Sequence, residues 1–301
     1  MNKKVLIALL VPAVLFASAL VIYGIIYRDA QRLPDNNPRS YLEQGSAARK
    51  RPVVVCAGDS ITHGRVSVDY VDILARRPKL RGYAFVNAGI NSELAFNLRL
   101  RLDAIIRCDP AVITILIGTN DANASLNDRS AQRAISEMNL PRKPDREWFR
   151  ENLTALCVKL KARTKARIAL LSLPPIGEEP GSDAYRRAAE YSRIIRDVAA
   201  EQKVDYLPLN ETMSRGIEGR GVAPELRYEG DTEMPLYIVL AKHYLLRKSY
   251  DEISEENGLY YLTDLLHLNT RGASAVADLI EEYIHKGNPP TPPERGFRDQ
   301  Y

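Results

Sequence analysis

From Pro52 onward, short β-branched runs alternate with longer helical patterns, and this alternation constrains the fold more than any other feature. The run at 111–117 is almost wholly apolar, as expected of a central strand buried on both faces. Repeated strand–helix–strand units predict an α/β fold with a parallel sheet covered by helices on both faces. The expected strands are 53–57, 83–86, 111–117, 167–172 and 204–207, and the expected helices are 66–77, 93–107, 147–163, 183–202 and 270–285.

The size and charge of the chain fit one globular domain with a short appendage. It has 301 residues, of which 45% are hydrophobic and 27% charged. The net charge of +4 is spread along the whole length, so no basic block predicts a nucleic-acid partner. The cysteines, Cys56, Cys108 and Cys157, lie in apolar surroundings and lack the close spacing of a zinc site, so we expect buried thiols.

The amino-terminal residues contain an uncharged apolar run from Val5 to Tyr27. As a helix this run would extend roughly 34 Å, enough for a bilayer core of about 30 Å. Ala17-Ser18-Ala19 would suit a signal-peptide cleavage site, but the apolar residues continue well beyond it. We therefore predict a single-pass transmembrane signal-anchor at 1–28 and an extracytoplasmic domain, which would be secreted if the segment is cleaved.

Several segments fall outside the strand–helix alternation. The polar residues 29–52 predict a tether between membrane and domain, and the proline-rich tail at 288–301 is expected to be disordered. The polar stretch 122–145 follows a strand end, where open α/β sheets bind ligands, and could form part of a substrate rim. The segment 210–258 reads as an insertion, and its apolar patch at 235–246 fits either a helix packed on the domain or a lid over a site.

The first expected strand leads directly into Gly58-Asp59-Ser60-Ile61-Thr62. A serine there lies at the carboxyl edge of the sheet, where the start of an adjoining helix supplies backbone N–H donors, and this position suits a nucleophile. The fifth residue of the block is Thr62, whereas the nucleophile elbow of α/β-hydrolases has glycine there. Taken alone, Gly-Asp-Ser is also a common turn sequence.

Three further blocks accompany this serine. Asn87-Ala88-Gly89 follows the second expected strand, Gly118-Thr119-Asn120-Asp121 follows the third, and Asp264-Leu265-Leu266-His267 precedes the last helix. In this order and at these places, the four blocks resemble the SGNH (GDSL-like) serine hydrolase family of esterases and lipases, over about 53–285. The resemblance implies a flavodoxin-like three-layer α/β/α sandwich with about five parallel strands, as a hydrolase domain at 53–287.

The resemblance also implies roles for individual residues. Ser60 would be the nucleophile, His267 its general base and Asp264 the carboxylate that orients the imidazole. The backbone N–H groups of Ser60 and Gly89 and the side chain of Asn120 would form the oxyanion hole. Residues spaced like Asp264 and His267 also face the same way if they lie on a helical turn.

The other polar residues near these blocks receive structural interpretations. Asp59 and Asp121 are interpreted as local turn caps with no chemical step. His63 is expected to be an exposed loop residue. His63, His243 and His285 show no metal-ligand spacing, and the implied chemistry requires neither a metal nor a cofactor.

These patterns predict a membrane-anchored esterase that cleaves a carboxylic ester through an acyl-serine intermediate. An acetylated carbohydrate or envelope polymer and a lysophospholipid are both candidate substrates, and the membrane is the expected partner of the amino-terminal helix. Two alternatives remain open: an O-acyltransferase that uses the same site, and a catalytically silent module that binds a glycan.

Overall fold

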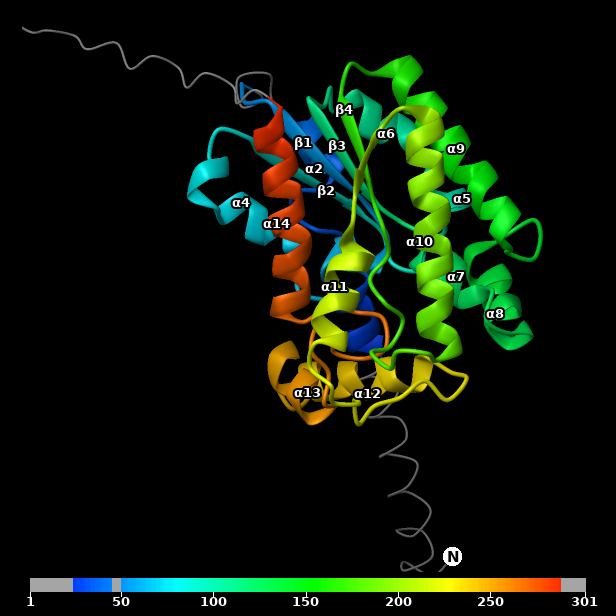
Figure 1. The fold of residues 1–301 in the computed structure, drawn as a ribbon. Helices are drawn as coiled ribbons and strands as arrows, with labels where there is room; N and C mark the ends of the chain where they lie inside the picture. The colour runs from blue at the N-terminus through cyan, green and yellow to red at the C-terminus, as the bar shows by residue number, and fades with distance from the viewer. Residues whose placement is uncertain (1–23, 45–49, 288–301) are drawn as a thin grey trace, which may run out of the picture.

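Five parallel strands form the centre of the computed structural model, which describes residues 24–44 and 50–287 (Figure 1). The strands are β1 (Val53–Gly58), β2 (Ala84–Gly89), β3 (Val112–Leu116), β4 (Arg167–Leu171) and β5 (Asp205–Leu207), and their order in the sheet is β2-β1-β3-β4-β5. Every neighbouring pair is parallel. The predicted parallel sheet of five strands is confirmed.

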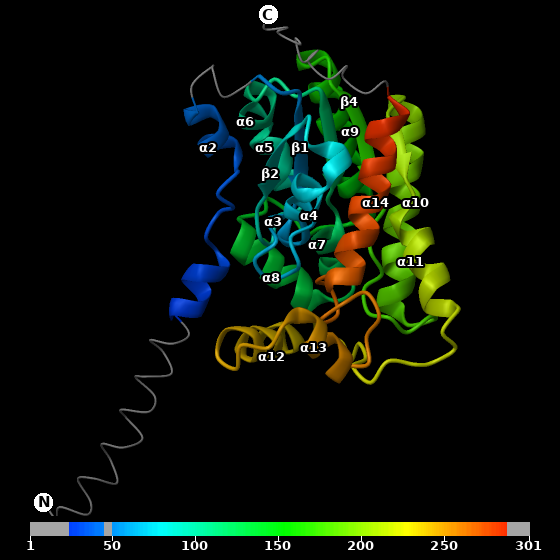
Figure 2. The same ribbon diagram turned by 90° about the vertical axis from the view of Figure 1, so that its left-hand side faces the viewer.

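Helices cover both faces of this sheet and the end at which its strands finish (Figures 1 and 2). Helices α5, α6, α9 and α10 pack on one face, α4, α11 and α14 pack on the other, and α12 and α13 lie at the carboxyl end of the strands. Together they make the predicted three-layer sandwich. Their bounds are α2 (Pro38–Glu43), α3 (Ser60–His63), α4 (Tyr70–Arg76), η1 (Pro78–Leu80), α5 (Ala95–Leu100), α6 (Leu102–Arg107), α7 (Thr119–Ala124), α8 (Asp128–Met138), α9 (Arg146–Arg163), α10 (Asp183–Gln202), α11 (Leu209–Glu218), α12 (Glu233–Tyr244), α13 (Tyr250–Glu256) and α14 (Thr270–Lys286).

The apolar runs of the strands arise because both faces of the sheet are buried. In β1, Val53 and Val55 point into the core under α5, α9 and α10, whereas Val54 and Cys56 point into the core under α4 and α14. Each fully buried valine stabilises the fold by about 1.5–3 kcal/mol. All three cysteines are buried thiols outside any disulfide, as predicted, and burial raises the pKa of Cys56 to about 12.

The segment before β1 is packed on the domain, so the predicted tether at 29–52 is wrong for its described part. Tyr41 of α2 is buried in the core, and the Asn36 backbone oxygen accepts the Asn87 N–H at 3.0 Å beside the edge strand β2. Within the described ranges no helix is long and apolar enough to cross a membrane. Most of the predicted anchor, and all of the predicted tail at 288–301, lie outside the described residues.

Capping residues explain where the helices differ from their predicted bounds. The first was expected at 66, but Asp69 accepts hydrogen bonds from the N–H groups of Val71 and Asp72 and starts α4 at Tyr70. The expected helix at 93–107 is divided into α5 and α6 at Arg101. The irregular stretches contain helices too: α8 lies within 122–145, and most of α11 and the whole of α12 and α13 lie within 210–258.

Candidate active site

The register of the sheet brings three loops to one edge. Gly58, at the end of β1, lies opposite Gly89 at the end of β2 and opposite Leu116 at the end of β3. The chain therefore leaves these three strands side by side, and the segments that follow can contribute side chains to a common point.

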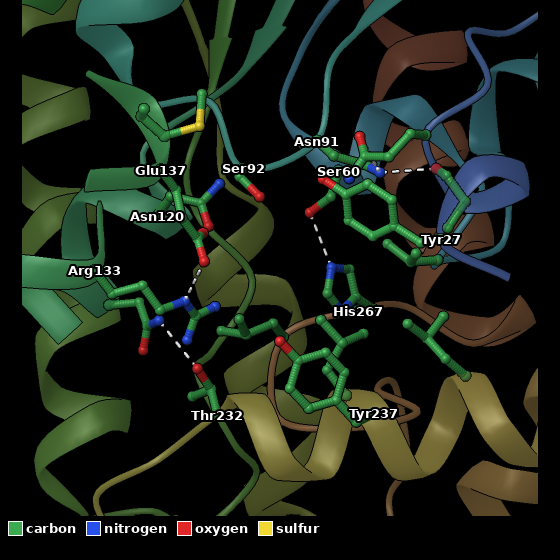
Figure 3. A pocket seen from close by; sticks show the side chains of 18 of the residues that line it. Tyr27, Ser60, Asn91, Ser92, Asn120, Arg133, Glu137, Thr232, Tyr237 and His267 are labelled. Carbon is green, nitrogen blue, oxygen red and sulfur yellow. Dashed lines mark hydrogen bonds and ion pairs between the residues drawn. The ribbon is translucent and has the colours of Figure 1, made fainter. Parts of the chain in front are cut away.

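Ser60 is the first residue of α3, and Asp59 caps that helix by accepting the N–H of Ile61 at 3.1 Å. The Ser60 hydroxyl lies 2.9 Å from Nε2 of His267 (Figure 3). Nδ1 of His267 lies 2.8 Å from a carboxylate oxygen of Asp264. All three residues are buried, and Ser60 and His267 line a cavity. The structure thus joins the three predicted residues in one hydrogen-bonded chain.

Asp264 and His267 face one another for a different reason from the predicted helical turn. Their segment is a tight loop that Thr263 closes by donating its N–H to the His267 carbonyl at 2.8 Å. The second oxygen of Asp264 accepts the N–H groups of Leu266 and His267, at 2.6 and 2.7 Å. The carboxylate therefore folds its own loop and at the same time aligns the imidazole.

Glu178 positions the residues directly before this loop, a role that the sequence analysis did not predict. Its buried carboxylate accepts three consecutive backbone N–H groups, those of Tyr260, Tyr261 and Leu262, at 2.6, 2.6 and 2.9 Å. Burial raises the pKa of Glu178, although these hydrogen bonds oppose the rise. A glutamate 82 residues before Tyr260 in the chain carries no signal of this role in the sequence.

The charge of Asp264 raises the pKa of the His267 imidazole. Burial alone would lower the pKa of His267, but the neighbouring Asp264 carboxylate and its hydrogen bond outweigh burial, and the charge of Asp59 adds to them. The pKa of His267 is therefore raised above its ordinary value of 6.5. An imidazole with a raised pKa is a stronger proton acceptor for the Ser60 hydroxyl.

The structure contradicts the predicted role of Gly89 as an oxyanion donor. Its backbone N–H donates to the side chain of Asn87 at 3.0 Å, and Gly89 does not line the cavity. Glycine is required there for packing, because a Cβ atom would come within 2.1 Å of the His63 backbone nitrogen. Ser92 takes the place of Gly89 as a candidate donor: it lines the cavity, and its N–H meets no acceptor among the described residues.

The other two predicted donors border the cavity beside Ser92 (Figure 3). One side-chain N–H of Asn120 donates to the backbone oxygen of Glu93 at 3.0 Å, which orients the amide and leaves its second N–H for a ligand. Ser92 itself has a φ of 62°, a left-handed conformation that serine seldom adopts and that the sequence alone does not reveal.

The other polar residues of the sequence blocks, Asp59, Asp121 and His63, are buried. Asp59 caps α3 as predicted, but Asp121 accepts the N–H of Ala95 at the start of α5, which is not a local contact. Burial raises the pKa of each of these carboxyl groups to about 7. His63 is only 1% exposed, so its predicted exposure is wrong, and burial, with the charge of Arg65, lowers its pKa to about 4.

The cavity has a volume of about 650 Å³ and two chemically different walls. In Figure 3, polar side chains of α7, α8 and the start of α12 gather on one side, among them Asn120, Arg133 and Thr232. Apolar and aromatic side chains of residues 26–30 and of α12 line the other side, among them Tyr27 and Tyr237. The stretch 122–145 thus lines the cavity as predicted, and the insertion contributes part of its wall.

Comparisons with known proteins agree with this architecture. The model of the GDSL-like lipase/acylhydrolase family matches residues 56–275. No curated protein matches the chain. Three similar solved structures, all under 25% identical and so similar in fold, are the acetyl xylan esterase AlAXEase (21% identity, TM-score 0.52, 77% of this chain and 99% of that chain), a lipase/acylhydrolase from Enterococcus faecalis (20%, 0.52, 78% and 96%) and the acetylxylan esterase Axe2 from Geobacillus stearothermophilus (16%, 0.53, 77% and 93%).

Proposed function

The chain belongs to the GDSL-like lipase/acylhydrolase family and is a serine hydrolase of carboxylic esters, and from this premise we propose that Ser60, His267 and Asp264 are its catalytic residues. The observation that carries the proposal is the buried chain of hydrogen bonds from the Ser60 hydroxyl through His267 to Asp264, at 2.9 and 2.8 Å. These are the contacts that an activated serine nucleophile requires.

The reaction follows from these contacts. The Ser60 oxygen attacks the ester carbonyl while its proton passes to Nε2 of His267, and the Ser60 N–H, the Ser92 N–H and the Asn120 amide stabilise the negative oxygen. The C–O bond of the ester then breaks, and the alcohol leaves with the proton from His267. Water next gives a proton to His267 and attacks the acyl-serine. The bond between the acyl carbon and the Ser60 oxygen then breaks, and His267 returns its proton to that oxygen, which releases the acid and restores the Ser60 hydroxyl.

We also propose that the run from Val5 to Tyr27 anchors the enzyme in a membrane with its domain on the extracytoplasmic side. The length and uncharged character of the run support this proposal. Mass spectrometry of the mature protein tests it: an intact amino terminus is expected, whereas a terminus directly after Ala19 would identify a cleaved signal peptide.

Covalent labelling tests the proposed nucleophile. A fluorophosphonate probe is expected to modify Ser60, so that digestion and mass spectrometry find the adduct on the peptide that contains this residue. Ser274→Ala, which changes a half-buried serine of α14 outside the cavity, should label like the wild type. Labelling of another serine, or none, would contradict the proposal, and absence of labelling is what a silent binding module predicts.

The acid limb of the pH profile is expected above pH 6.5. Only neutral His267 can accept the Ser60 proton, so kcat/KM should rise with pH through the pKa of His267, which is raised from its ordinary 6.5. The measurement is ester hydrolysis over a pH series. In Asp59→Asn the half-maximal rate should be reached at a lower pH, because the charge of Asp59 helps to raise the pKa of His267. A half-maximal rate well below pH 6.5 in the wild type would contradict the prediction.

Asn120→Ala is expected to lower kcat by about 10²- to 10³-fold with little change in KM, because it removes one donor to the oxyanion. The measurement is steady-state hydrolysis of a p-nitrophenyl ester. Asn123→Ala is the matched control, since Asn123 also lines the cavity but donates to Thr232. Equal losses in the two variants would show that Asn120 has no special part in stabilising the transition state.

A further inference from the structure

Helix α12 is apolar around most of its circumference, yet little of it is buried. Val239 packs against Tyr250 and Ile253 of α13, and it is the one fully buried hydrophobic residue of α12. Met234, Tyr237 and Ile238 are 59%, 43% and 48% exposed. The apolar surface continues past the helix end through Leu245 and Leu246, which are 51% and 66% exposed. A soluble protein rarely exposes so many large apolar side chains together.

A second exposed apolar segment lies beside the same cavity. Residues 24–30 form a helix in which Ile25 and Tyr27 are 56% and 55% exposed, and Ile26 and Tyr27 line the cavity together with Leu236 and Tyr237 of α12. In Figure 2 this helix and α12 lie at the same end of the molecule. We name these two segments, residues 24–30 and 233–246, the apolar rim.

The chain before residue 24 indicates what covers the apolar rim. The uncharged residues from Val5 to Tyr23 lead directly into the rim, so that the longest apolar run of the sequence meets the domain at the mouth of the Ser60 cavity. A bilayer that holds this run would lie next to residues 24–30, which line the same cavity as α12. Arg28 lies within the rim and Arg247 directly follows it, and both are exposed and have no ion-pair partner among the described residues, which suits an anionic lipid surface.

The two walls of the cavity fit a molecule that such a surface supplies. The apolar wall, which includes Tyr27 and Leu240 of the rim, can hold an acyl chain, whereas the opposite wall carries Arg133 and Glu137 for a polar alcohol group. Ser60 and His267 also line this cavity. An acetyl group would leave most of the apolar wall uncovered, whereas a long acyl chain would cover it.

We infer that the apolar rim docks on a lipid bilayer and that the Ser60 cavity takes up a membrane amphiphile, an ester of a long acyl chain with a polar alcohol, directly from that bilayer. This inference rests on the proposed function and selects the lipid ester from its candidate substrates. The bilayer is the one occupant of the rim that would both cover the exposed side chains and deliver the substrate.

The docking is tested with the full-length protein in vesicles of phosphatidylcholine and phosphatidylglycerol. The chain has a single tryptophan, the buried Trp148, which gives a constant background. In Ile238→Trp, brominated phosphatidylcholine is expected to quench the added tryptophan. In Val158→Trp, at an equally exposed position on α9, it should not. Both positions belong to the same anchored chain, so the comparison reports which face meets the lipid.

Kinetics test the delivery of the substrate with two esters that share one leaving group. The double variant Ile238→Ser/Leu246→Ser is expected to lower kcat/KM for vesicle-borne p-nitrophenyl palmitate about tenfold or more, and to change hydrolysis of p-nitrophenyl acetate by less than about twofold. Neither residue lines the cavity. The control Leu100→Ser/Val158→Ser, which removes apolar side chains that are 63% and 53% exposed, should change neither rate.

The outcomes separate this inference from the proposed function. If the wild type cleaves neither ester, the proposed function fails. If it cleaves the acetate but the Ile238→Trp tryptophan is not quenched, or the palmitate rate does not fall in the rim variant, the inference is overturned. A change in sedimentation mass of the rim variant without quenching would assign the rim to a second copy of the chain, which also overturns it.

Discussion

Ser60→Ala is expected to lower kcat for p-nitrophenyl ester hydrolysis by about 10⁴- to 10⁶-fold, the largest effect of any single substitution in this chain. Without the hydroxyl there is no acyl-serine, so only the oxyanion donors and substrate binding remain to accelerate attack by water. The loss should appear in kcat, because Ser60 contributes little to binding of the intact ester. Stopped or continuous assays at high enzyme concentration measure it.

The matched control for this variant is Ser274→Ala, which should keep wild-type rates because Ser274 lies outside the cavity. Circular dichroism and thermal melting would establish that Ser60→Ala is folded, as expected for loss of one hydroxyl. Residual activity within about tenfold of the wild type would exclude Ser60 as the nucleophile, since even one lost oxyanion donor costs more than that.

Asp264→Asn is expected to lower kcat by about 10⁴-fold. The asparagine oxygen can still accept the N–H groups of Leu266 and His267, so the loop should keep its shape. Its NH₂ group, however, would face Nδ1 of His267 and force the imidazole proton onto Nε2, the atom that must accept the Ser60 proton. The base would be present in the wrong tautomer.

Asp278→Asn provides the comparison, because Asp278 is a carboxylate on α14 that pairs with Arg77 at the surface, outside the cavity. It is expected to leave kcat unchanged. NMR of the imidazole nitrogens would report the tautomer directly in Asp264→Asn. A variant with the proton still on Nδ1, or with kcat near the wild-type value, would refute the proposed role of Asp264.

The fold could be predicted from the sequence because the patterns that indicate strands and helices are local. The apolar run at 111–117 and the regular spacing of strand and helix patterns sufficed for the parallel sheet and for the long helices α9, α10 and α14. The insertion could not be predicted in the same way. Helix α12 is apolar on several sides, so its sequence does not say which side faces the protein.

The candidate site was predictable where residue type and strand position carry the information. The structure brings Ser60, His267 and Asp264 together, and their catalytic roles stay predictions. The assignment of Gly89 failed because a glycine after a strand can serve packing as well as hydrogen bonding, and only coordinates show that its N–H faces Asn87. Glu178 was missed because its partners are backbone N–H groups, which have no signature in the sequence.

The hydrogen bonds of Glu178 to residues 260–262 separate the segment that lines the cavity from the segment that carries Asp264 and His267. The chain passes from β5 through α11, α12 and α13. Just before Asp264, the N–H groups of Tyr261 and Leu262 donate hydrogen bonds to Glu178. Substitutions or length changes between β5 and residue 260 can therefore alter the wall of the cavity without changing the distances between Ser60, His267 and Asp264. A lineage that inherits this arrangement is free to exchange the esters it accepts without rebuilding the machinery that breaks them.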